Sequence, residues 1–206
     1  MKNGGAMFIA VEGVDGAGKT ETVRCLAERL KGVKLKTPPK AYQDMQSHFD
    51  LNDNERSEER VLARFHFYKA GLYESAISVR QLSAAGLSVI VDRWTQSTIL
   101  YHRQLLGYNH PDLLIGSHLP NPDFTFVLQP PLQIILDRLR RREKHHDHSL
   151  EQDQQFLATM YDQYAALQDV VHVDSGSDSI EEVTDRIIAS YLLSDQIREV
   201  GHAEDY

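Results

Sequence analysis

The sequence predicts an α/β fold in which a parallel sheet of about five strands is covered by helices on both faces. Short apolar runs alternate along the chain with longer stretches of helical periodicity, and this alternation is typical of parallel sheets with helical crossovers. In addition, the sequence GVDGAGKT at residues 13–20 joins the first apolar run to the first helical stretch. A strand, a glycine-rich turn and a helix in this order are the setting in which a phosphate-binding loop works.

Each predicted element follows from local pattern and from its boundary residues. The predicted strands are residues 8–11, 32–37, 88–91, 124–128 and 170–173. The predicted helices are residues 21–30, 57–85, 97–106, 131–142, 152–166 and 180–193. Gly86 and Gly107 each end a helix, and Pro131 begins one. We expect residues 40–56 and 108–123 to be irregular, and the polar residues 194–206 to form a flexible tail.

Composition narrows the function classes. A chain of 206 residues suits a single domain, and its net charge of −8 argues against broad binding to nucleic acid. No apolar run reaches the roughly 18 residues that a membrane-spanning helix needs. The only cysteine, Cys25, cannot form an intrachain disulfide, which favours a cytoplasmic protein.

The glycine-rich loop predicts a site for a nucleoside triphosphate. Its glycines let the backbone approach phosphate groups, and the helix that follows adds a partial positive charge. Lys19 is expected to reach the terminal phosphates of ATP, and the Thr20 hydroxyl to bind magnesium. The predicted cofactors are therefore ATP and Mg²⁺, and the residues expected to hold them are Gly13, Val14, Asp15, Gly16, Ala17, Gly18, Lys19 and Thr20.

Local positive charge also predicts where an anionic substrate binds. Arg93 follows the strand at residues 88–91, and ligands of parallel sheets bind at the carboxyl ends of the strands. A guanidinium grips phosphate through two parallel hydrogen bonds, which suits such a site. A second basic cluster ends the helix at residues 131–142 and consists of Arg138, Arg140, Arg141, Arg142 and Lys144.

With these residues in view, the chain resembles the thymidylate kinase family of P-loop nucleoside monophosphate kinases. The resemblance spans residues 7–193 and depends on four segments, at residues 8–30, 89–94, 97–101 and 122–128. It implies a P-loop kinase fold with a basic lid at residues 138–150, a homodimer, and transfer of the γ-phosphoryl group of ATP to a deoxynucleoside monophosphate, dTMP above all.

The resemblance also implies roles for individual residues. Asp15 matches the carboxylate that accepts from the 3′-hydroxyl of the acceptor sugar, and Arg93 the arginine that binds the acceptor phosphate. Asp92 matches the carboxylate beside magnesium. Phe67 matches the ring stacked on thymine, and Tyr101 the ring that excludes a ribose. The remaining implied residues are Ser97 and Thr98 for the acceptor, and Arg138, Arg141 and Arg142 as catalytic lid arginines beside Lys19, Asp15 and Arg93.

The acceptor half departs from the family pattern. The family has an arginine that reads the base four residues after its stacking phenylalanine, where this chain has Gly71. The segment after the second strand is also different and contains Pro38 and Pro39. Ser149 stands where the lid normally has an arginine, and Gln129 where a strand often ends in aspartate. These differences predict an altered choice of acceptor base.

Two other functions remain open at this stage. One is a P-loop kinase of a deoxynucleoside or a specialised metabolite, which Gly71 and the two prolines favour. The other is a nucleotide-binding regulator without turnover, against which the basic cluster argues. The histidines at residues 145, 146 and 148 are interpreted as a polar turn rather than a metal site, because no cysteine lies near them.

Overall fold

The protein is described here from a computed structural model, which covers residues 6–49, 51, 56–107, 110–141, 150, 153–176 and 178–201. Its centre is a five-stranded parallel sheet with the strand order β2-β3-β1-β4-β5. The strands are β1 (Phe8–Glu12), β2 (Val33–Lys36), β3 (Val89–Asp92), β4 (Phe124–Leu128) and β5 (Val171–Val173). The α/β fold and its five parallel strands confirm the prediction from the sequence.

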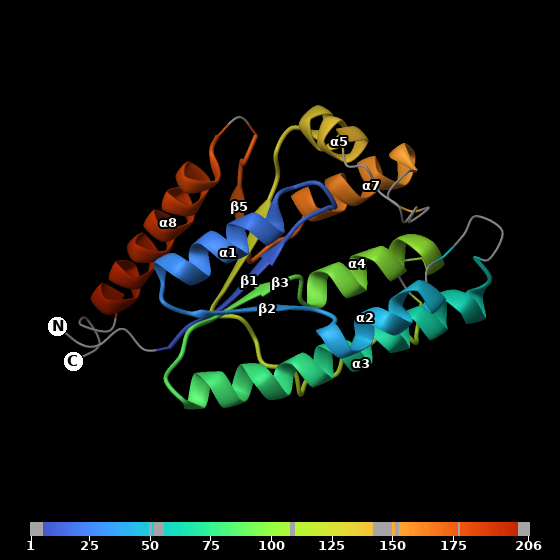
Figure 1. The fold of residues 1–206 in the computed structure, drawn as a ribbon, viewed down its shortest axis with the longest axis horizontal. Coiled ribbons are helices and arrows are strands. Elements are labelled where there is room, and N and C mark those ends of the chain that lie inside the picture. The colour runs from blue at the N-terminus through green and yellow to red at the C-terminus, as the bar shows by residue number, and fades with distance from the viewer. Residues whose placement is uncertain are drawn as a thin grey trace.

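The helices also follow the predicted order. They are α1 (Lys19–Arg29), α2 (Lys40–Gln46), α3 (Glu58–Ala84), α4 (Thr95–Leu106), α5 (Leu132–Arg141), α7 (Gln154–Ala165) and α8 (Ile180–Gly201), with a short 3₁₀ helix η1 (Ser47–Phe49). Figure 1 shows the sheet between α3 on one side and α1 with α8 on the other. None of the helices in the described ranges is long and apolar enough to span a membrane.

Alternation along β1 explains why both faces are covered. Phe8 and Ala10 pack into one cluster with apolar residues of α3, while Ile9 and Val11 pack into another with residues of α1 and α8. Every residue of β1 is buried. Successive side chains of a strand point to opposite faces, so a fully buried strand needs a layer of helices on each side.

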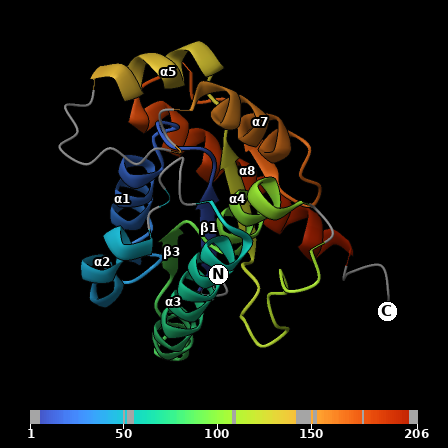
Figure 2. The same ribbon diagram turned by 90° about the vertical axis from the view of Figure 1, so that its right-hand side faces the viewer.

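The strand order places the site. β1 lies between β3 and β4, and the chain builds the sheet outward on both sides of it. In parallel sheets such a reversal opens a crevice at the carboxyl ends of the central strands, where ligands bind. The glycine-rich loop follows β1 and Arg93 follows β3, so both lie at this end. α4 follows Arg93 and packs against α3 on one side and α7 on the other (Figure 2).

Two segments differ from the expectation. Residues 40–49 form α2 and η1 instead of irregular chain, and Pro39 occupies the N-cap position of α2. A proline before the first helical turn fits there because its fixed φ and missing N–H cost nothing at that position. In addition, α8 continues to Gly201, beyond the predicted end at residue 193.

Candidate active site

The glycine-rich loop depends on backbone conformations that favour glycine. Gly13, Gly16 and Gly18 have φ values of 134°, 84° and 100°. A Cβ atom on Gly13 would lie 2.7 Å from the carbonyl oxygen of Leu128, which is too close for any side chain. Gly18 directly precedes α1, whose first N–H groups have no partner within the helix. The loop therefore ends in a set of N–H groups suited to phosphate oxygens.

Lys19 lies across this loop. Its Nζ donates to the carbonyl oxygen of Val14 at 2.7 Å, and the residue is only 6% exposed. Burial, followed by the nearby charge of Arg93, lowers the pKa of Lys19 to about 8, while Asp15, Asp92 and Glu12 act in the opposite direction. The ammonium group is thus held near the loop in poorly hydrated surroundings, where its attraction for a phosphate is strong.

Thr20 and Asp92 form a pair of oxygen groups beside the loop. The Thr20 hydroxyl donates to Asp92 Oδ2 at 2.7 Å. Asp92 ends β3 and is 4% exposed, and its Oδ1 is buried without a hydrogen-bond partner in the described part of the chain. A buried carboxylate oxygen with spare capacity, next to a hydroxyl, suits Mg²⁺, which takes one or two carboxylates and completes its shell with phosphates and waters.

Asp15 of the glycine-rich loop meets Ser97 and Tyr101 of α4 at Arg93. Its guanidinium lies between two groups: Nη2 donates to Asp15 Oδ1, and Nη1 donates to Ser97 Oγ at 3.2 Å. The Tyr101 hydroxyl donates to the other Asp15 oxygen at 3.0 Å, and the guanidinium carbon lies 5.7 Å from the centre of the Tyr101 ring. Burial, with the Asp15 charge adding to it, raises the pKa of Tyr101, so its hydroxyl stays protonated and donates. The structure therefore brings together Asp15, Arg93, Ser97 and Tyr101.

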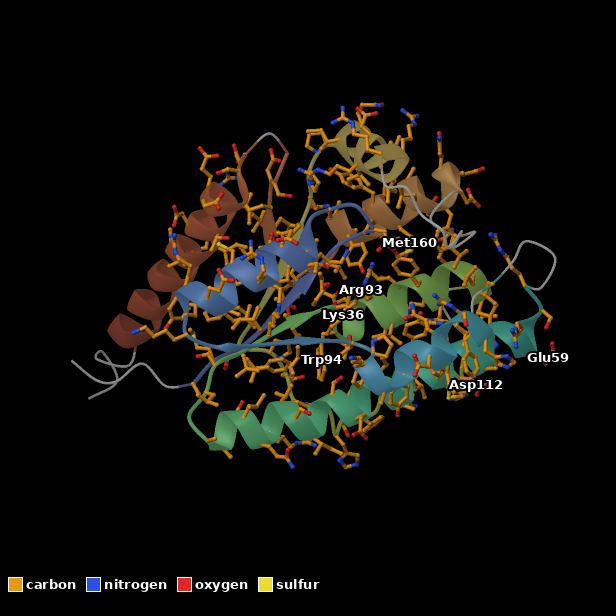
Figure 3. All side chains as sticks on the ribbon, viewed as in Figure 1. Lys36, Glu59, Arg93, Trp94, Asp112 and Met160 are labelled. Carbon is orange, nitrogen blue, oxygen red and sulfur yellow. The ribbon has the colours of Figure 1, made fainter. Side chains whose placement is uncertain are left out.

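Figure 3 labels Arg93 and the next residue, Trp94, which point to different parts of the molecule. Trp94 packs in the apolar cluster between the sheet and α3, and its Nε1–H donates to the carbonyl oxygen of Pro120 at 3.3 Å. This buried anchor holds the turn after β3, so that Arg93 remains at the crevice.

Sequence reasoning overlooked Glu12 as a site residue. It ends β1 directly before the loop, is 0% exposed, and accepts the backbone N–H groups of Trp94 and Ser97. Burial raises the pKa of this carboxyl group, against the hydrogen bonds that lower it. The available signal was a carboxylate at the end of an otherwise apolar strand, because a buried acid needs nearby donors.

The surroundings of Phe67 differ from an open platform for a base. Phe67 is buried, and the ring of Phe49 from η1 stacks on it with a centroid distance of 4.4 Å and an interplanar angle of 16°. The ring of Tyr42 from α2 lies 5.4 Å away. The segment that was expected to be irregular thus covers one face of Phe67. Whether Phe67 contacts a base stays a prediction.

Two departures from the family pattern prove to be in contact. A Cβ atom on Gly71 would lie 2.8 Å from Cβ of Pro38, which follows a cis peptide bond. Any larger residue at position 71 would therefore overlap the proline. Gly71, which replaces the family's arginine, and Pro38, in the altered segment after β2, therefore form one contact, and the two departures are linked.

The basic cluster is only partly described. Arg138 lies against the glycine-rich loop: its Nη1 is 3.3 Å from the carbonyl oxygen of Gly16 and 3.4 Å from that of Ala17. Its Nη2 is 3.5 Å from the carbonyl oxygens of both Ser175 and Gly176. Arg138 thus braces the loop through its backbone.

The rest of the proposed lid stays a prediction. Arg141 is exposed in the last turn of α5, while Arg142 and the histidines at residues 145, 146 and 148 lie outside the described residues.

Thr98, another residue expected at the acceptor site, is buried, and its carbonyl oxygen lies 2.6 Å from Nδ1 of His102. No cluster of three or more acidic, histidine or cysteine side chains suited to a metal occurs among the described residues.

This fold and site define the class as a P-loop kinase acting on nucleotides. The family model for thymidylate kinase matches residues 11–187. The chain therefore belongs to the thymidylate kinase family, and it is a nucleoside monophosphate kinase.

Similar proteins agree with this assignment. The thymidylate kinase of Thermosipho africanus is 28% identical over 194 residues, which cover 86% of this chain and 93% of the relative. A probable thymidylate kinase of Archaeoglobus fulgidus is 31% identical over 147 residues, or 67% of this chain and 71% of the relative.

Solved structures show the same fold. A thymidylate kinase of Candida albicans superposes with a TM-score of 0.74 at 21% identity, covering 93% of both chains. A deoxyadenosine kinase of M. mycoides superposes with a TM-score of 0.67 at 16% identity, covering 90% of this chain and 98% of the other. Because a nucleoside kinase shares the architecture, the fold alone does not select the acceptor.

Proposed function

We propose that the protein transfers the γ-phosphoryl group of ATP to dTMP and releases ADP and dTDP. The observation that carries this proposal is the cluster of Arg93, Asp15 and Tyr101 beside Lys19 of the phosphate-binding loop. A guanidinium already held on two sides, at the carboxyl end of a parallel strand, is suited to a second phosphate facing the one on the loop.

The chemistry needs positioning and charge more than proton transfer. An oxygen of the acceptor phosphate attacks the γ-phosphorus, and the bond to the oxygen that bridges the β- and γ-phosphates breaks. The acceptor oxygen is already ionised at neutral pH, so no side chain must remove a proton. Lys19 and Arg93 balance the negative charge of the two phosphates, which would otherwise repel one another.

Magnesium would be held by Thr20 and Asp92 when bound, and it would neutralise charge on the phosphates. We predict that Asp92→Asn raises the Mg²⁺ concentration needed for half-maximal turnover and lowers maximal turnover ~10-fold or more, because an amide is a weaker ligand than a carboxylate. Magnesium titrations of turnover measure both effects. The matched control is Asp112→Asn, because Asp112, labelled in Figure 3, is an exposed aspartate. Identical titrations for Asp92→Asn and wild type would contradict the assignment.

Choice of sugar and base tests the acceptor site. Tyr101 is fixed by Asp15, so its ring keeps one position and should exclude a ribose 2′-hydroxyl. Gly71 offers no side chain to the base, and a site without a buried hydrogen-bonding partner discriminates poorly between analogues. We therefore predict a strong preference for deoxyribonucleotides together with weak discrimination among bases.

The panel that tests this compares kcat/KM for dTMP, dUMP, dCMP and UMP, with thymidine as the unphosphorylated acceptor. We expect the deoxynucleotides to differ by no more than ~10-fold, because no charged or bidentate contact is lost between them. A preference for dTMP above 10³-fold would contradict the relaxed base choice, and efficient use of UMP would contradict the role of Tyr101.

A second candidate is a kinase of deoxynucleosides, which the altered surroundings of Gly71 and Pro38 favour. It requires that thymidine be used better than dTMP, and Arg93 would then lack its phosphate.

By family resemblance we also propose a homodimer, and the single, buried Cys25 fits the reducing conditions of the cytoplasm. Light scattering on the purified protein measures its mass in solution and so tests the homodimer.

A further inference from the structure

Arg93 reaches the acceptor site from a backbone conformation that residues with side chains rarely adopt. Its φ is 72°, in the left-handed region. In L-residues this conformation brings Cβ close to a carbonyl oxygen and costs free energy, so it persists only where the surroundings fix it. The residues that fix it are therefore candidates for a role in placing the guanidinium.

Three hydrogen bonds hold this backbone. The Arg93 N–H donates to the carbonyl oxygen of Val11 at 3.0 Å, and the Arg93 carbonyl oxygen accepts from the Thr37 hydroxyl at 2.6 Å. The next N–H, of Trp94, donates to Glu12 Oε1 at 2.9 Å. The first contact continues the pairing of β1 with β3. The Glu12 contact instead depends on one buried side chain placed beneath the turn.

A second set of contacts holds the side chain. Ser97 Oγ donates to Glu12 Oε2, and the Ser97 N–H donates to Oε1 at 3.2 Å. Because the Ser97 proton goes to the carboxylate, Tyr164 is the donor in its contact with Ser97 Oγ at 2.9 Å, and Arg93 Nη1 donates to the same oxygen at 3.2 Å. Ser97 is 7% exposed, and Tyr164, from α7, is 1% exposed. The Ser97 hydroxyl, which accepts from the Arg93 guanidinium, is thus held by Glu12 on one side and by Tyr164 on the other.

We propose that Glu12 and Tyr164 are positioning residues for Arg93. Glu12 holds the turn after Arg93, and Tyr164 fixes the Ser97 hydroxyl that receives the guanidinium. This inference rests on the proposed function, in which Arg93 binds the acceptor phosphate. It assigns Tyr164 on α7 a part in acceptor binding although the side chain is buried away from solvent.

The first test removes one hydroxyl group. Tyr164→Phe should lower kcat/KM for dTMP ~10-fold, the effect of about one hydrogen bond, and leave the KM for ATP within ~2-fold. Tyr161→Phe, one turn earlier on α7, should match wild type. Combining Tyr164→Phe with Arg93→Lys should add little to the loss from Arg93→Lys alone, because both changes act on the same contact. An unchanged kcat/KM in Tyr164→Phe, an equal loss for ATP, or independent effects in the double variant would overturn the proposal.

The second test uses Glu12. Glutamine keeps an oxygen for both backbone N–H groups, but it places an N–H donor where Glu12 Oε2 accepts from Ser97 Oγ. Glu12→Gln should therefore lower kcat/KM for dTMP ~10-fold, as Tyr164→Phe does, whereas Glu12→Ala, which also leaves the two N–H groups unpaired, should lower it ~10²-fold or more. Equal losses in both variants would overturn the role of Glu12. If Glu12→Ala does not fold, Tyr164→Phe and Glu12→Gln still decide the matter.

A crystal structure of Tyr164→Phe needs no substrate and separates this inference from the proposed function. We expect the Arg93 guanidinium to leave hydrogen-bond distance of Ser97 Oγ, and an unmoved Arg93 would overturn the inference. A wild-type protein that does not phosphorylate dTMP would instead contradict the proposed function, and the displaced guanidinium would remain as the evidence for positioning.

Discussion

Replacing Lys19 by alanine should lower turnover by at least ~10²-fold, because contacts to charge that develops in the transition state are worth this much or more. Lys19 is buried beside the loop, and its Nζ donates to the Val14 carbonyl oxygen. Alanine is favourable in the first turn of a helix, and removing a buried charge relieves a desolvation cost. The variant should therefore fold as wild type does while losing activity.

Steady-state turnover with saturating ATP and dTMP measures the effect, with circular dichroism as the check on folding. Lys34→Ala is the matched control, since Lys34 is exposed on β2. A folded Lys19→Ala protein with wild-type turnover would show that the glycine-rich loop does not hold the transferred phosphoryl group.

Arg93→Lys should lower kcat/KM for dTMP by ~10²-fold, since small misplacements of a reacting group cost about this much. Lysine keeps the positive charge and the same backbone demand as arginine. It loses the planar fork whose two nitrogens meet Asp15 and Ser97. The substitution thus isolates the geometry of the clamp from its charge.

The KM for ATP should change by less than ~3-fold, because Arg93 acts on the acceptor rather than the donor. Arg24→Lys provides the control, since Arg24 is an exposed arginine that also bridges two carboxylates, Glu21 and Glu28. If Arg93→Lys loses ATP binding and dTMP use in equal measure, Arg93 belongs to the nucleotide loop instead of the acceptor site.

The donor half of the site was predictable because its determinants are local. The loop between β1 and α1 depends on glycines and on Lys19 and Thr20 within eight residues, and the structure confirms the strand and helix on either side. Arg93 was predictable for a similar reason, since the run before it is a buried strand and the ends of parallel strands share one edge.

The rest of the acceptor half was not predictable because it depends on contacts between distant segments. Phe49 covers Phe67 only after residues 40–49 fold into helices, and the composition of these residues does not predict that contact. The overlap between Gly71 and Pro38 joins two positions that appear unrelated in the sequence. The role of Glu12 likewise depends on where the next turn of the sheet places Trp94 and Ser97.

The most direct measurement follows the phosphoryl group itself. Wild-type protein is incubated with ATP labelled in the γ-phosphate, Mg²⁺, and either dTMP or thymidine, and the labelled products are separated. We predict that the label appears in dTDP, at its β-phosphate, and that thymidine yields almost none. Label appearing in dTMP made from thymidine, or only in inorganic phosphate whether or not dTMP is present, would contradict the assignment of Arg93 as a clamp for an acceptor phosphate.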